Sequence, residues 1–563
     1  MLEFPAPEST GSGDEAHASS GSDSCSGLAG AIGAAIADAR LAKSKGADLV
    51  EFRIDAVFEG AEHGPDADEL DAYTVAEFRR LLAESPLPVI LTCRPTWEGG
   101  EYDGDDSDRV ALFEKLCCDT DHPPAYLDVE LAAYTRSANL RQKINLCVTH
   151  PKQQRTSVTT RLILSTHDFE GRPADLDRRL LAMYDEPACA VVKVAYRARS
   201  LRDNLDLFEI LRERPKPIIA LGMGEFGLMS RVLAPKFNGF LTFASLRDQA
   251  ATAPGQPTID DLLGLYRFRK IGKATKLYGV IGWPVGHSLS PLIHNAGFEQ
   301  IGWDGVYMPL PIAADENDEA ASETSFKATV QIMLEDAILG FVGASVTLPH
   351  KRALFHLAES EGLLEPSPLN GIGAMNTLYV SDDDRIQPIF ATNTDAIAIE
   401  YMLEPHADPA PHVHIYGAGG VARAAAYSAG LIARYVFIHN RTPERAEALA
   451  EELPFEAAAL PMEIERGTPA GGIHINCTSV GMTGGPDPSG LSIPIDRMDF
   501  AMSREESIFL DTVYNPIETP MLRAARARGC RTIDGVEMFV RQAAAQFELW
   551  TGEQAPLQLF ERL

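Results

Sequence analysis

Short apolar runs alternate with amphipathic segments through the first half of the chain. The segments between the runs, such as Ala31–Lys45 and Arg202–Arg212, repeat apolar residues at helical spacing. Alternating strands and helices are typical of a parallel sheet. The predicted strands are Leu49–Asp55, Pro88–Arg94, Ala125–Leu131, Arg161–Phe169, Cys189–Tyr196, Lys216–Gly224 and Gly239–Leu246.

A closed (β/α)8 TIM barrel needs eight strands, and the pattern predicts one fewer. The remaining strand should precede the helix at Ala31, where the sequence is rich in serine, glycine, aspartate and glutamate. That composition predicts a disordered tail over residues 1–27, which lacks the apolar core of a secretory signal and the arginines of a transit peptide. We expect an α/β barrel over residues 28–272, and the sequence leaves open whether its first strand is missing.

The pattern changes in the second half. The proline- and glycine-rich stretch Ala251–Thr258 and a predicted helix, Ile259–Ile271, end the first unit. A second unit begins with the predicted strand Lys276–Gly282 and breaks at the proline- and histidine-rich Glu404–Pro411, after which His412–Tyr416 starts a nucleotide-binding βαβ pattern. We expect a substrate domain at 276–400, a Rossmann domain at 410–520 and helices that return to the substrate domain at 521–563.

Composition limits the partners. A chain of 563 residues with 45% hydrophobic and 23% charged content fits more than one globular domain. A net charge of −30 would repel phosphate backbones, so we expect no nucleic-acid partner, and no apolar stretch approaches the roughly 18 residues of a membrane span. The 8 cysteines include no Cys-x-x-Cys pair, which predicts reduced thiols, no metal site and a cytoplasmic protein.

Polar residues in the first half gather toward the C-terminal ends of the predicted strands, where barrel enzymes place their active sites. Lys193 lies within the apolar run Cys-Ala-Val-Val-Lys-Val-Ala-Tyr, and burial favours the neutral amine, which can form a Schiff base. His167 can then move a proton beside the imine, with Glu98 orienting it. Ordinary explanations are an edge-strand lysine, a core histidine and a structural Glu51–Arg53 ion pair.

Together these motifs resemble type I 3-dehydroquinate dehydratase over about residues 30–270. They are Glu51-Phe-Arg53, Arg94 with Glu98-Gly-Gly, Ser165-Thr-His167, Val192-Lys193, Met223-Gly224 through Ser230-Arg231, and Ala253-Pro-Gly-Gln256. The resemblance implies that Lys193 is the Schiff-base lysine, that His167 is the general acid/base, and that Glu51 and Glu98 position the histidine. It implies that the substrate's carboxylate and hydroxyls are held by Arg53, Arg94, Arg231 and Gln256. The implied reaction removes water from 3-dehydroquinate to give 3-dehydroshikimate.

Two further groups of polar residues lie in the second half. Ser288 and Ser290 stand between a predicted strand and a helix, where two hydroxyls can bind a carboxylate, although an N-cap serine is the ordinary explanation. Lys351 follows another predicted strand, and Asp395 lies further along the chain. A lysine near an aspartate can pass a proton to a forming alcohol, whereas a surface salt bridge is the ordinary explanation of such a pair.

A glycine-rich turn follows the strand His412–Tyr416. Gly417-Ala-Gly419-Gly420-Val-Ala422 is a Gly-x-Gly-x-x-Ala motif, which permits close approach of a pyrophosphate to a helix N-terminus. The next predicted strand ends in Asn440-Arg441-Thr442, where an NAD site usually carries an acidic residue. Arg441 suits a 2′-phosphate and favours NADP, while an exposed arginine that caps the next helix is the ordinary explanation.

These segments resemble shikimate dehydrogenase over about residues 276–563. The match continues in Asn476-Cys-Thr478, Asp511-Thr-Val-Tyr514 and Asp534-Gly535 through Gln542. The resemblance implies that Ser288 and Ser290 hold the substrate carboxylate and that Lys351 and Asp395 form the catalytic pair. It implies that the substrate hydroxyls contact Thr347, Asn376, Tyr514 and Gln542, and that NADP binds at Gly417, Gly419, Gly420, Ala422, Asn440, Arg441, Thr442 and Gly535. Ser345 departs from the family, where asparagine is usual.

The sequence therefore predicts a bifunctional enzyme of small-molecule substrates that dehydrates 3-dehydroquinate and then reduces 3-dehydroshikimate to shikimate with NADPH. A non-catalytic sensor of shikimate intermediates is one alternative, but a sensor needs no reactive lysines. An NAD-dependent quinate or shikimate dehydrogenase is another, which a comparison of NADH and NADPH turnover would separate. The sequence does not define the oligomeric state.

Overall fold

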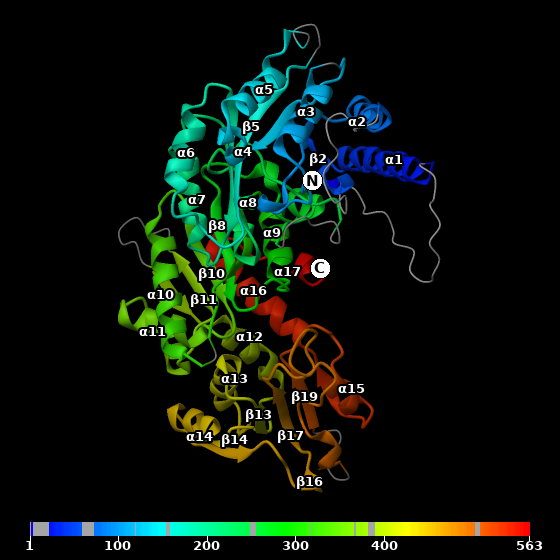
Figure 1. Ribbon diagram of the computed structural model, residues 1–563. Coiled ribbons are helices and arrows are strands. Elements are labelled where there is room, and N and C mark those ends of the chain that lie inside the picture. Colours follow the sequence, from blue (N-terminus) through cyan, green and yellow to red (C-terminus); the bar gives the residue numbers. More distant parts are fainter. Residues whose placement is uncertain are drawn as a thin grey trace. The chain divides into compact units, whose positions relative to one another are not determined.

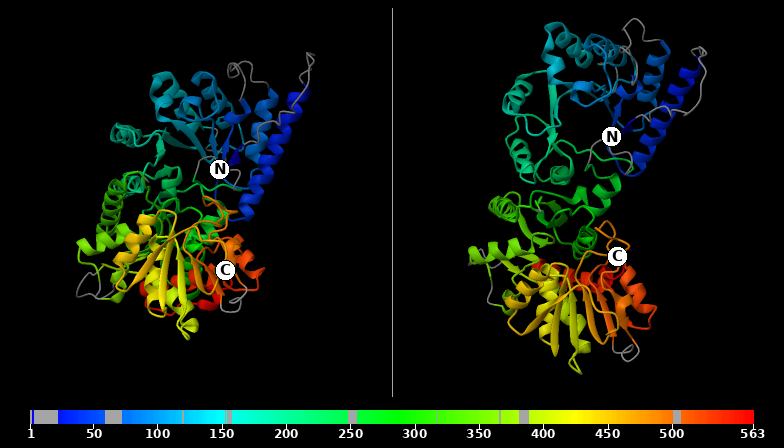
Figure 2. Two further views of the ribbon diagram at one scale, coloured as in Figure 1. Left: turned by 90° about the horizontal axis from the view of Figure 1, so that it is seen from below. Right: turned by 60° about the horizontal axis from the view of Figure 1, so that its bottom comes forward.

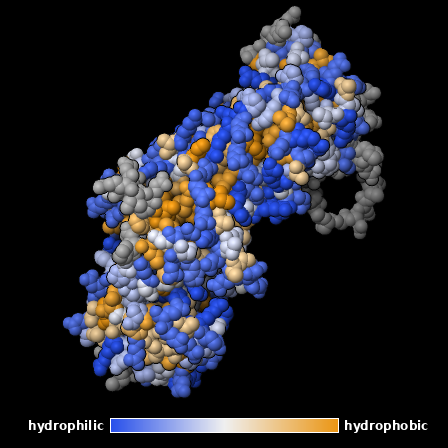
Figure 3. Space-filling model, turned by 90° about the vertical axis from the view of Figure 1, so that its left-hand side faces the viewer, coloured by the Kyte–Doolittle hydropathy of each residue, from blue (hydrophilic) through white to orange (hydrophobic). Residues whose placement is uncertain are grey.

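The computed structural model divides the chain into two compact units, Met1–Thr275 and Lys276–Leu563 (Figure 1). The residues that it describes are 2–3, 22–58, 72–118, 120–151, 153, 158–247, 255–315, 317–364, 367–380, 389–500 and 507–563. Hydrophilic side chains cover much of the face drawn in Figure 3, with hydrophobic side chains between them, as is usual for folded proteins. Among the described helices, none is long and apolar enough to cross a membrane.

The first unit is built on seven parallel strands that follow one another in chain order in one sheet. Every residue of β3, β4 and β7 is buried, because helices and loops cover both faces of a parallel sheet. The strands are β1 (Leu2–Glu3), β2 (Val50–Arg53), β3 (Val89–Thr92), β4 (Tyr126–Glu130), β5 (Arg161–Asp168), β6 (Cys189–Arg197) and β7 (Ile218–Met223). The helices are α1 (Ser22–Ser44), α2 (Ala72–Glu84), α3 (Asp106–Cys117), α4 (Leu131–Arg136), α5 (Ala138–Thr149), α6 (Leu176–Asp185), α7 (Asp203–Arg212) and α8 (Leu228–Val232).

The predicted tail is wrong at both of its ends. Leu2 and Glu3 pair in parallel with Phe52 and Arg53, so a first strand is present, although it is only two residues long. The first helix begins at Ser22 rather than Ala31, and residues 22–27 are therefore helical. The rest of the predicted disordered segment, residues 4–21, lies outside the described residues.

Of the two elements predicted at the end of the first unit, the strand is wrong and the helix is only partly confirmed. Gly239–Leu246 forms no regular strand; in the described residues its contacts include a hydrogen bond from the Phe240 N–H to the Ile218 carbonyl (2.8 Å) and a single bridge between Ser245 and Thr258. The predicted helix Ile259–Ile271 contains a π-helical turn, η6 (Asp261–Leu265), and a 3-10 turn, η7 (Phe268–Lys270).

A mixed five-stranded sheet opens the second unit, in the order β12-β11-β10-β8-β9. Its strands are β8 (Lys276–Gly282), β9 (Gly305–Pro311), β10 (Phe341–Val346), β11 (Thr377–Val380) and β12 (Ile389–Thr392). Around it lie α9 (Ser290–Ile301), α10 (Glu319–Glu335), α11 (Lys351–Ser360), α12 (Thr394–Leu403), α16 (Gly535–Thr551) and α17 (Leu557–Phe560). Phe547 and Trp550 of α16 pack with Tyr278 and Phe298, so the end of the chain completes the core of this sheet.

A six-stranded parallel sheet forms the rest of the second unit (Figure 2, right, yellow to orange). Its order, β15-β14-β13-β17-β19-β20, is that of a doubly wound Rossmann fold. The strands are β13 (His412–Tyr416), β14 (Tyr435–Asn440), β15 (Ala457–Pro461), β17 (Gly472–Asn476), β19 (Ser507–Asp511) and β20 (Arg531–Ile533). The helices are α13 (Gly420–Gly430), α14 (Pro443–Glu452) and α15 (Pro520–Arg526), and β16 (Thr468–Pro469) pairs with β18 (Met498–Asp499).

The two faces of this sheet differ chemically. Valine, isoleucine and leucine side chains of one face pack with alanines of α13. The other face carries a histidine ladder, defined here as His414, His439 and His474. The ring nitrogens of His414 and His439 lie 3.1 Å apart, and the His474 ring stacks on His414 with centroids 4.8 Å apart. Burial lowers the pKa of His414 to about 2 and that of His474 to about 4, so the ladder is neutral in the folded chain.

Candidate active sites

Lys193 points from β6 into the interior of the first unit, where it is 3% exposed. Its Nζ donates to Asp128 Oδ2 at 2.6 Å and lies 3.5 Å from Glu51 Oε1. Strands β2, β4 and β6 supply these side chains, because alternate strands of a barrel contribute to one interior layer. The structure does not bear out the predicted neutral amine, because Nζ is ion-paired with Asp128.

Asp128 is a site residue that the sequence motifs missed. Burial alone would raise the pKa of this carboxyl, but Arg94 and Lys193 outweigh burial and hold the pKa well below its usual range. Its Oδ1 accepts a 2.6 Å hydrogen bond from Ser165 Oγ, and Arg94 Nη2 lies 3.1 Å from Oδ2. The available signal was an acidic residue inside the fully buried strand β4.

His167 and Glu98 form the predicted pair. His167 Nδ1 lies 2.9 Å from Glu98 Oε2, and the His167 backbone N–H donates to the same oxygen at 3.2 Å. Burial raises the pKa of Glu98 to about 8, whereas burial, Arg94 and Lys193 lower the pKa of His167. The imidazole is consequently a neutral base near neutral pH.

A tight turn holds Glu98 in this place. Gly99 has the left-handed φ of 75°, and a Cβ at Gly100 would lie 2.0 Å from the Arg94 carbonyl oxygen. Neither position accepts a larger residue without moving the loop. The Glu98-Gly-Gly motif therefore fixes a carboxyl group beside the histidine.

The predicted arginines have different partners. Arg53 forms two hydrogen bonds with Asp55, at 2.8 and 2.6 Å, so the proposed Glu51–Arg53 ion pair is wrong. Arg94 pairs with Asp128 and with Glu130, which lies 2.6 Å away. Arg231 is 3% exposed and donates from Nε to the Gly222 carbonyl at 3.2 Å.

Among the described residues, no carboxylate forms an ion pair with Arg231, and burial lowers its pKa to about 10. A buried guanidinium without a counter-ion favours an anionic ligand. Gln256 is brought to the same end of the barrel, because a Cβ at its neighbour Gly255 would lie 2.4 Å from the Gly224 carbonyl oxygen. The segment that leads from β7 toward α8 and Arg231 thus runs beside the segment that carries Gln256.

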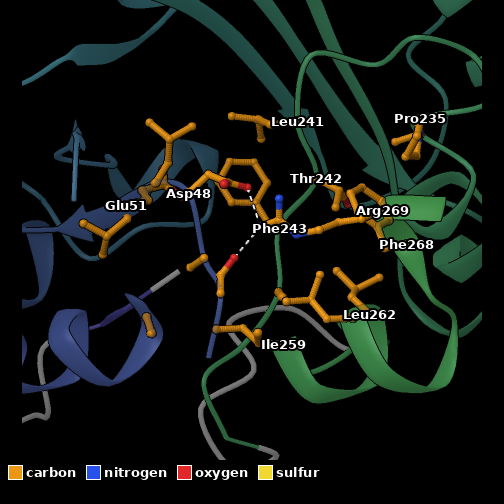
Figure 4. A pocket seen from close by; sticks show the side chains of 18 of the residues that line it. Asp48, Glu51, Pro235, Leu241, Thr242, Phe243, Ile259, Leu262, Phe268 and Arg269 are labelled. Carbon is orange, nitrogen blue, oxygen red and sulfur yellow. Dashed lines mark hydrogen bonds and ion pairs between the residues drawn. The ribbon is translucent and has the colours of Figure 1, made fainter. Parts of the chain in front are cut away.

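A cavity of about 500 Å³ adjoins Glu51 (Figure 4). Apolar side chains such as Leu241, Phe243 and Leu262 make up most of its lining, and it lies between β2 and the segment 241–244. Of the predicted site residues only Glu51 lines it, and the Phe243 ring separates it from Lys193 Nζ, 4.8 Å from the ring centroid. The predicted chemistry therefore lies outside this cavity.

In the second unit Lys351 and Asp395 form a buried pair. Lys351 Nζ donates to Asp395 Oδ2 at 2.6 Å, from the first turn of α11 to the first turn of α12. A Cβ at Gly420 would lie 2.8 Å from Lys351 Cδ. The glycine-rich turn thus passes directly against the lysine, which places the acid/base pair beside the predicted cofactor loop.

The predicted substrate contacts of the second unit have partners of their own. The Ser290 backbone N–H donates to Ser288 Oγ at 3.2 Å. Burial raises the pKa of Tyr514, and a hydrogen bond with Ser288 partly offsets this rise. The Thr347 methyl group packs closely against Gly282, since a Cβ built at that glycine would lie 2.4 Å from the methyl carbon. Gln542 is buried on α16, with Nε2 donating to the Phe539 carbonyl at 3.0 Å.

The glycine motif has the form that a dinucleotide needs. Gly417 has a φ of 120°, and Ala422 is fully buried in α13. In the described part of the chain no side chain caps the α13 N-terminus at Gly419, so its N–H groups can face a phosphate. These residues fit a pyrophosphate. Gly535 begins α16 directly against the Val513 carbonyl, just after β19.

The predicted 2′-phosphate contacts follow β14. Arg441 is exposed, and Asn440 Nδ2 donates to the Thr442 carbonyl at 2.9 Å, which tightens the turn before α14. An exposed guanidinium at this position fits a phosphate group. In the described residues, no group of three or more histidine, cysteine or acidic side chains is arranged to hold a metal ion.

Known proteins match both units. Family models for type I 3-dehydroquinase, the shikimate dehydrogenase substrate binding domain and the shikimate 5′-dehydrogenase C-terminal domain match residues 29–273, 280–378 and 535–563. A shikimate dehydrogenase (NADP(+)) of Maridesulfovibrio salexigens is 38% identical over 283 residues, which are 50% of this chain and 93% of that protein. A crystal structure of a shikimate dehydrogenase in complex with NADP+ is 29% identical and covers 51% of this chain and 94% of its own, with a TM-score of 0.41.

A longer relative spans both units. The bifunctional 3-dehydroquinate dehydratase/shikimate dehydrogenase, chloroplastic, of Arabidopsis thaliana is 35% identical over 555 residues, which are 95% of this chain and 82% of that protein. The type I 3-dehydroquinase match confirms the predicted TIM-barrel class of the first unit, and the strand order confirms the Rossmann domain. This chain belongs to the family of bifunctional 3-dehydroquinate dehydratase/shikimate dehydrogenases.

Proposed function

We propose that the chain catalyses two successive reactions, the dehydration of 3-dehydroquinate and the reduction of 3-dehydroshikimate to shikimate with NADPH. The observation that carries the proposal is the presence of two separate buried acid/base sites in one chain, Lys193 with His167 and Lys351 with Asp395. The product of the first reaction is the substrate of the second, which supports the pairing. Family membership adds independent support.

The dehydration begins at Lys193. Its deprotonated amine adds to the substrate ketone, and loss of water gives an imine whose protonated form withdraws electrons from the neighbouring carbon. His167, as a neutral base, takes a proton from that carbon and returns it to the hydroxyl group that leaves as water. Hydrolysis of the imine consumes one water and restores the lysine, so one water is lost overall.

The charges around Lys193 suit an anionic substrate. Arg231 supplies a buried guanidinium whose ionic partner would be the substrate carboxylate. Arg53 and Arg94 are already paired with Asp55, Asp128 and Glu130, so their role is to place hydrogen-bond donors rather than to supply an unpaired charge. Gln256 adds an amide for a hydroxyl group.

The reduction uses Lys351 and Asp395. NADPH, when bound, supplies the hydride. Lys351 holds a proton at the ketone oxygen and passes it to the forming alcohol, and Asp395, 2.6 Å from Nζ, keeps the ammonium group in place. Ser288 and Ser290 would hold the carboxylate at the start of α9, and Thr347, Asn376, Tyr514 and Gln542 would contact the hydroxyls.

Cofactor choice is assigned to Arg441, because its guanidinium can pair with a 2′-phosphate that NADH lacks. An NAD-dependent quinate dehydrogenase would use NADH at least equally well. A non-catalytic sensor would not need the two ion-paired lysines. We also propose a cytoplasmic enzyme without a nucleic-acid partner, supported by the net charge of −30 and by free thiols at all seven cysteines that the structure describes.

A coupled assay tests the proposal directly. Purified protein with 3-dehydroquinate and NADPH should form shikimate, and Lys193→Ala should stop this while still reducing added 3-dehydroshikimate. Lys351→Ala should instead stop at 3-dehydroshikimate. Borohydride added with 3-dehydroquinate should fix a mass adduct on Lys193; an adduct elsewhere, or full dehydratase activity in Lys193→Ala, would refute the assignment.

A further inference from the structure

A chain of buried hydrogen bonds runs beneath the substrate side of the second unit. Ser345, on β10, is 7% exposed, and its Oγ lies 2.7 Å from Tyr307 Oη and 2.7 Å from Gln546 Oε1. An amide oxygen only accepts, so the serine hydroxyl donates to Gln546, and the Tyr307 hydroxyl must donate to the serine. Each hydroxyl thus has a defined direction.

The chain continues from Gln546 to Asn376. Gln546 Nε2 donates to Thr377 Oγ1 at 3.0 Å and to the Asn376 carbonyl at 3.3 Å. Thr377 Oγ1 donates to Asn376 Oδ1 at 2.9 Å, because that oxygen only accepts, and it lies 3.0 Å from Thr394 Oγ1. All of these side chains are buried, so water does not compete for the bonds.

Asn376 is thereby fixed in one amide orientation. Its Oδ1 also accepts from the Thr394 backbone N–H at 2.7 Å and from Thr394 Oγ1 at 3.1 Å, so three donors converge on the oxygen. The Nδ2 group is the end that remains for a ligand among the described residues. Thr394 directly precedes Asp395, so the same bonds tie the amide to the acid/base pair.

We infer that Tyr307 and Ser345 are positioning residues of the reductase site, which act through Gln546 and Thr377 to present the Asn376 amide nitrogen to a substrate hydroxyl. The inference rests on the proposed reduction of 3-dehydroshikimate. It also gives a role to Ser345, which stands where the resemblance expects asparagine: a hydroxyl both accepts from Tyr307 and donates to Gln546. Burial raises the pKa of Tyr307, which keeps its hydroxyl a donor.

The test compares Tyr307→Phe, Ser345→Ala and the double variant with Tyr278→Phe, in the full-length protein. Tyr278 is a matched control because it is a buried tyrosine of the same core whose hydroxyl bonds to Trp303 and the Trp550 carbonyl instead of this chain. Loss of one buried hydrogen bond predicts a KM for 3-dehydroshikimate raised about tenfold, with the KM for NADPH unchanged. The double variant should match the worse single variant, because the two hydroxyls act in series.

The outcomes separate this inference from the proposed function. Wild-type protein that fails to reduce 3-dehydroshikimate would reject the function itself. Active wild-type protein with Tyr307→Phe no different from Tyr278→Phe, or with losses that multiply in the double variant, would overturn only the positioning role. If Ser345→Ala does not fold, Tyr307→Phe alone decides, since it keeps the ring and removes one atom.

Discussion

Asp128 determines what Lys193 must do before it reacts. The sequence motifs predicted Lys193, His167 and Glu98, and the structure brings all three into the barrel interior. They did not predict Asp128, which is 65 positions from the lysine in the sequence. The 2.6 Å contact arises only in the folded barrel, where β4 and β6 contribute side chains to the same interior layer. The sequence motifs therefore predicted the reacting groups of the proposed dehydration, while the fold revealed the charged side chain beside them.

Asp128→Asn should weaken the barrel and its chemistry together. Removing one partner of a buried ion pair leaves Lys193 and Arg94 without their shared counter-ion, so we expect the free energy of unfolding to fall by about 3 kcal/mol. Dehydratase kcat should fall, while reductase kcat stays unchanged. Urea unfolding and the two separate assays measure this, with Asp185→Asn, an exposed site at the end of α6, as the control. Unchanged stability and dehydratase activity would contradict the role.

Local pattern predicted most strands but failed where pairing decides. Six of the predicted strands correspond to β2–β7, because buried β-branched runs between helices leave little ambiguity. Leu2–Glu3 is too short to show a period. Gly239–Leu246 has strand-like composition but forms no regular ladder in the described residues, although its Phe240 N–H reaches Ile218 of β7. Ile259–Ile271 has helical spacing, and residues 259–265 are helical, but the helix is partly π-helical and a separate 3-10 turn, Phe268–Lys270, follows it.

The contact between the glycine turn and α11 gives a second prediction. In Gly420→Ala the new Cβ would lie 2.8 Å from Lys351 Cδ and must displace the lysine from Asp395. A displacement of about 1 Å should lower reductase kcat roughly 100-fold and leave the dehydratase unaffected. Steady-state kinetics test this against Gly371→Ala, whose Cβ would make an ordinary 3.6 Å contact. Equal activity in the two variants would show that Lys351 has room to adjust.

The histidine ladder gives a pH dependence. In the folded chain the pKa values of these histidines are lowered, so below about pH 6.5 the unfolded chain binds more protons than the folded chain. The contribution of the ladder to the free energy of unfolding is therefore full above that pH and falls as the pH drops. Each neutral histidine should contribute a slope of about 1 kcal/mol per pH unit between about pH 5 and 6. His474→Asn should therefore flatten the fall in urea stability on acidification.

The matched control for the ladder is His412→Asn, on the exposed end of the same sheet face. The His412→Asn variant should keep the slope of unfolding free energy against pH that the unaltered chain has. The comparison uses slopes rather than absolute stabilities, because His474→Asn also removes the hydrogen bond between Tyr416 and the ring, 3.1 Å apart. Identical slopes in all three proteins would rule out the ladder as the source.

The two units have separate cores and separate chemistry. The boundary at Thr275 and Lys276 falls where the sequence pattern passes from barrel to substrate domain. The second unit completes its own core with α16 and α17 from the end of the chain. Each unit therefore has the parts that an independent domain requires.

A fragment of residues 276–563 should reduce 3-dehydroshikimate with the KM of the full chain. The physical reason is that Lys351, Asp395, the glycine turn and the core that supports them all lie within it. Expression of the fragment, a single cooperative unfolding transition and steady-state kinetics check the prediction. A fragment that folds only when the first unit is supplied would show that the two halves stabilise each other.

The two-residue pairing of β1 with β2 has a consequence for where the barrel opens locally. Strands β5 and β6 are paired over seven positions, whereas β1 holds β2 at Phe52 and Arg53 alone in the described residues. Transient opening should start at this short strand pairing, and amide protons of β2 should exchange with solvent sooner than those of β6. Glu51 directly precedes the two paired residues, so the interior layer that holds Lys193 should loosen at the Glu51 carboxylate first.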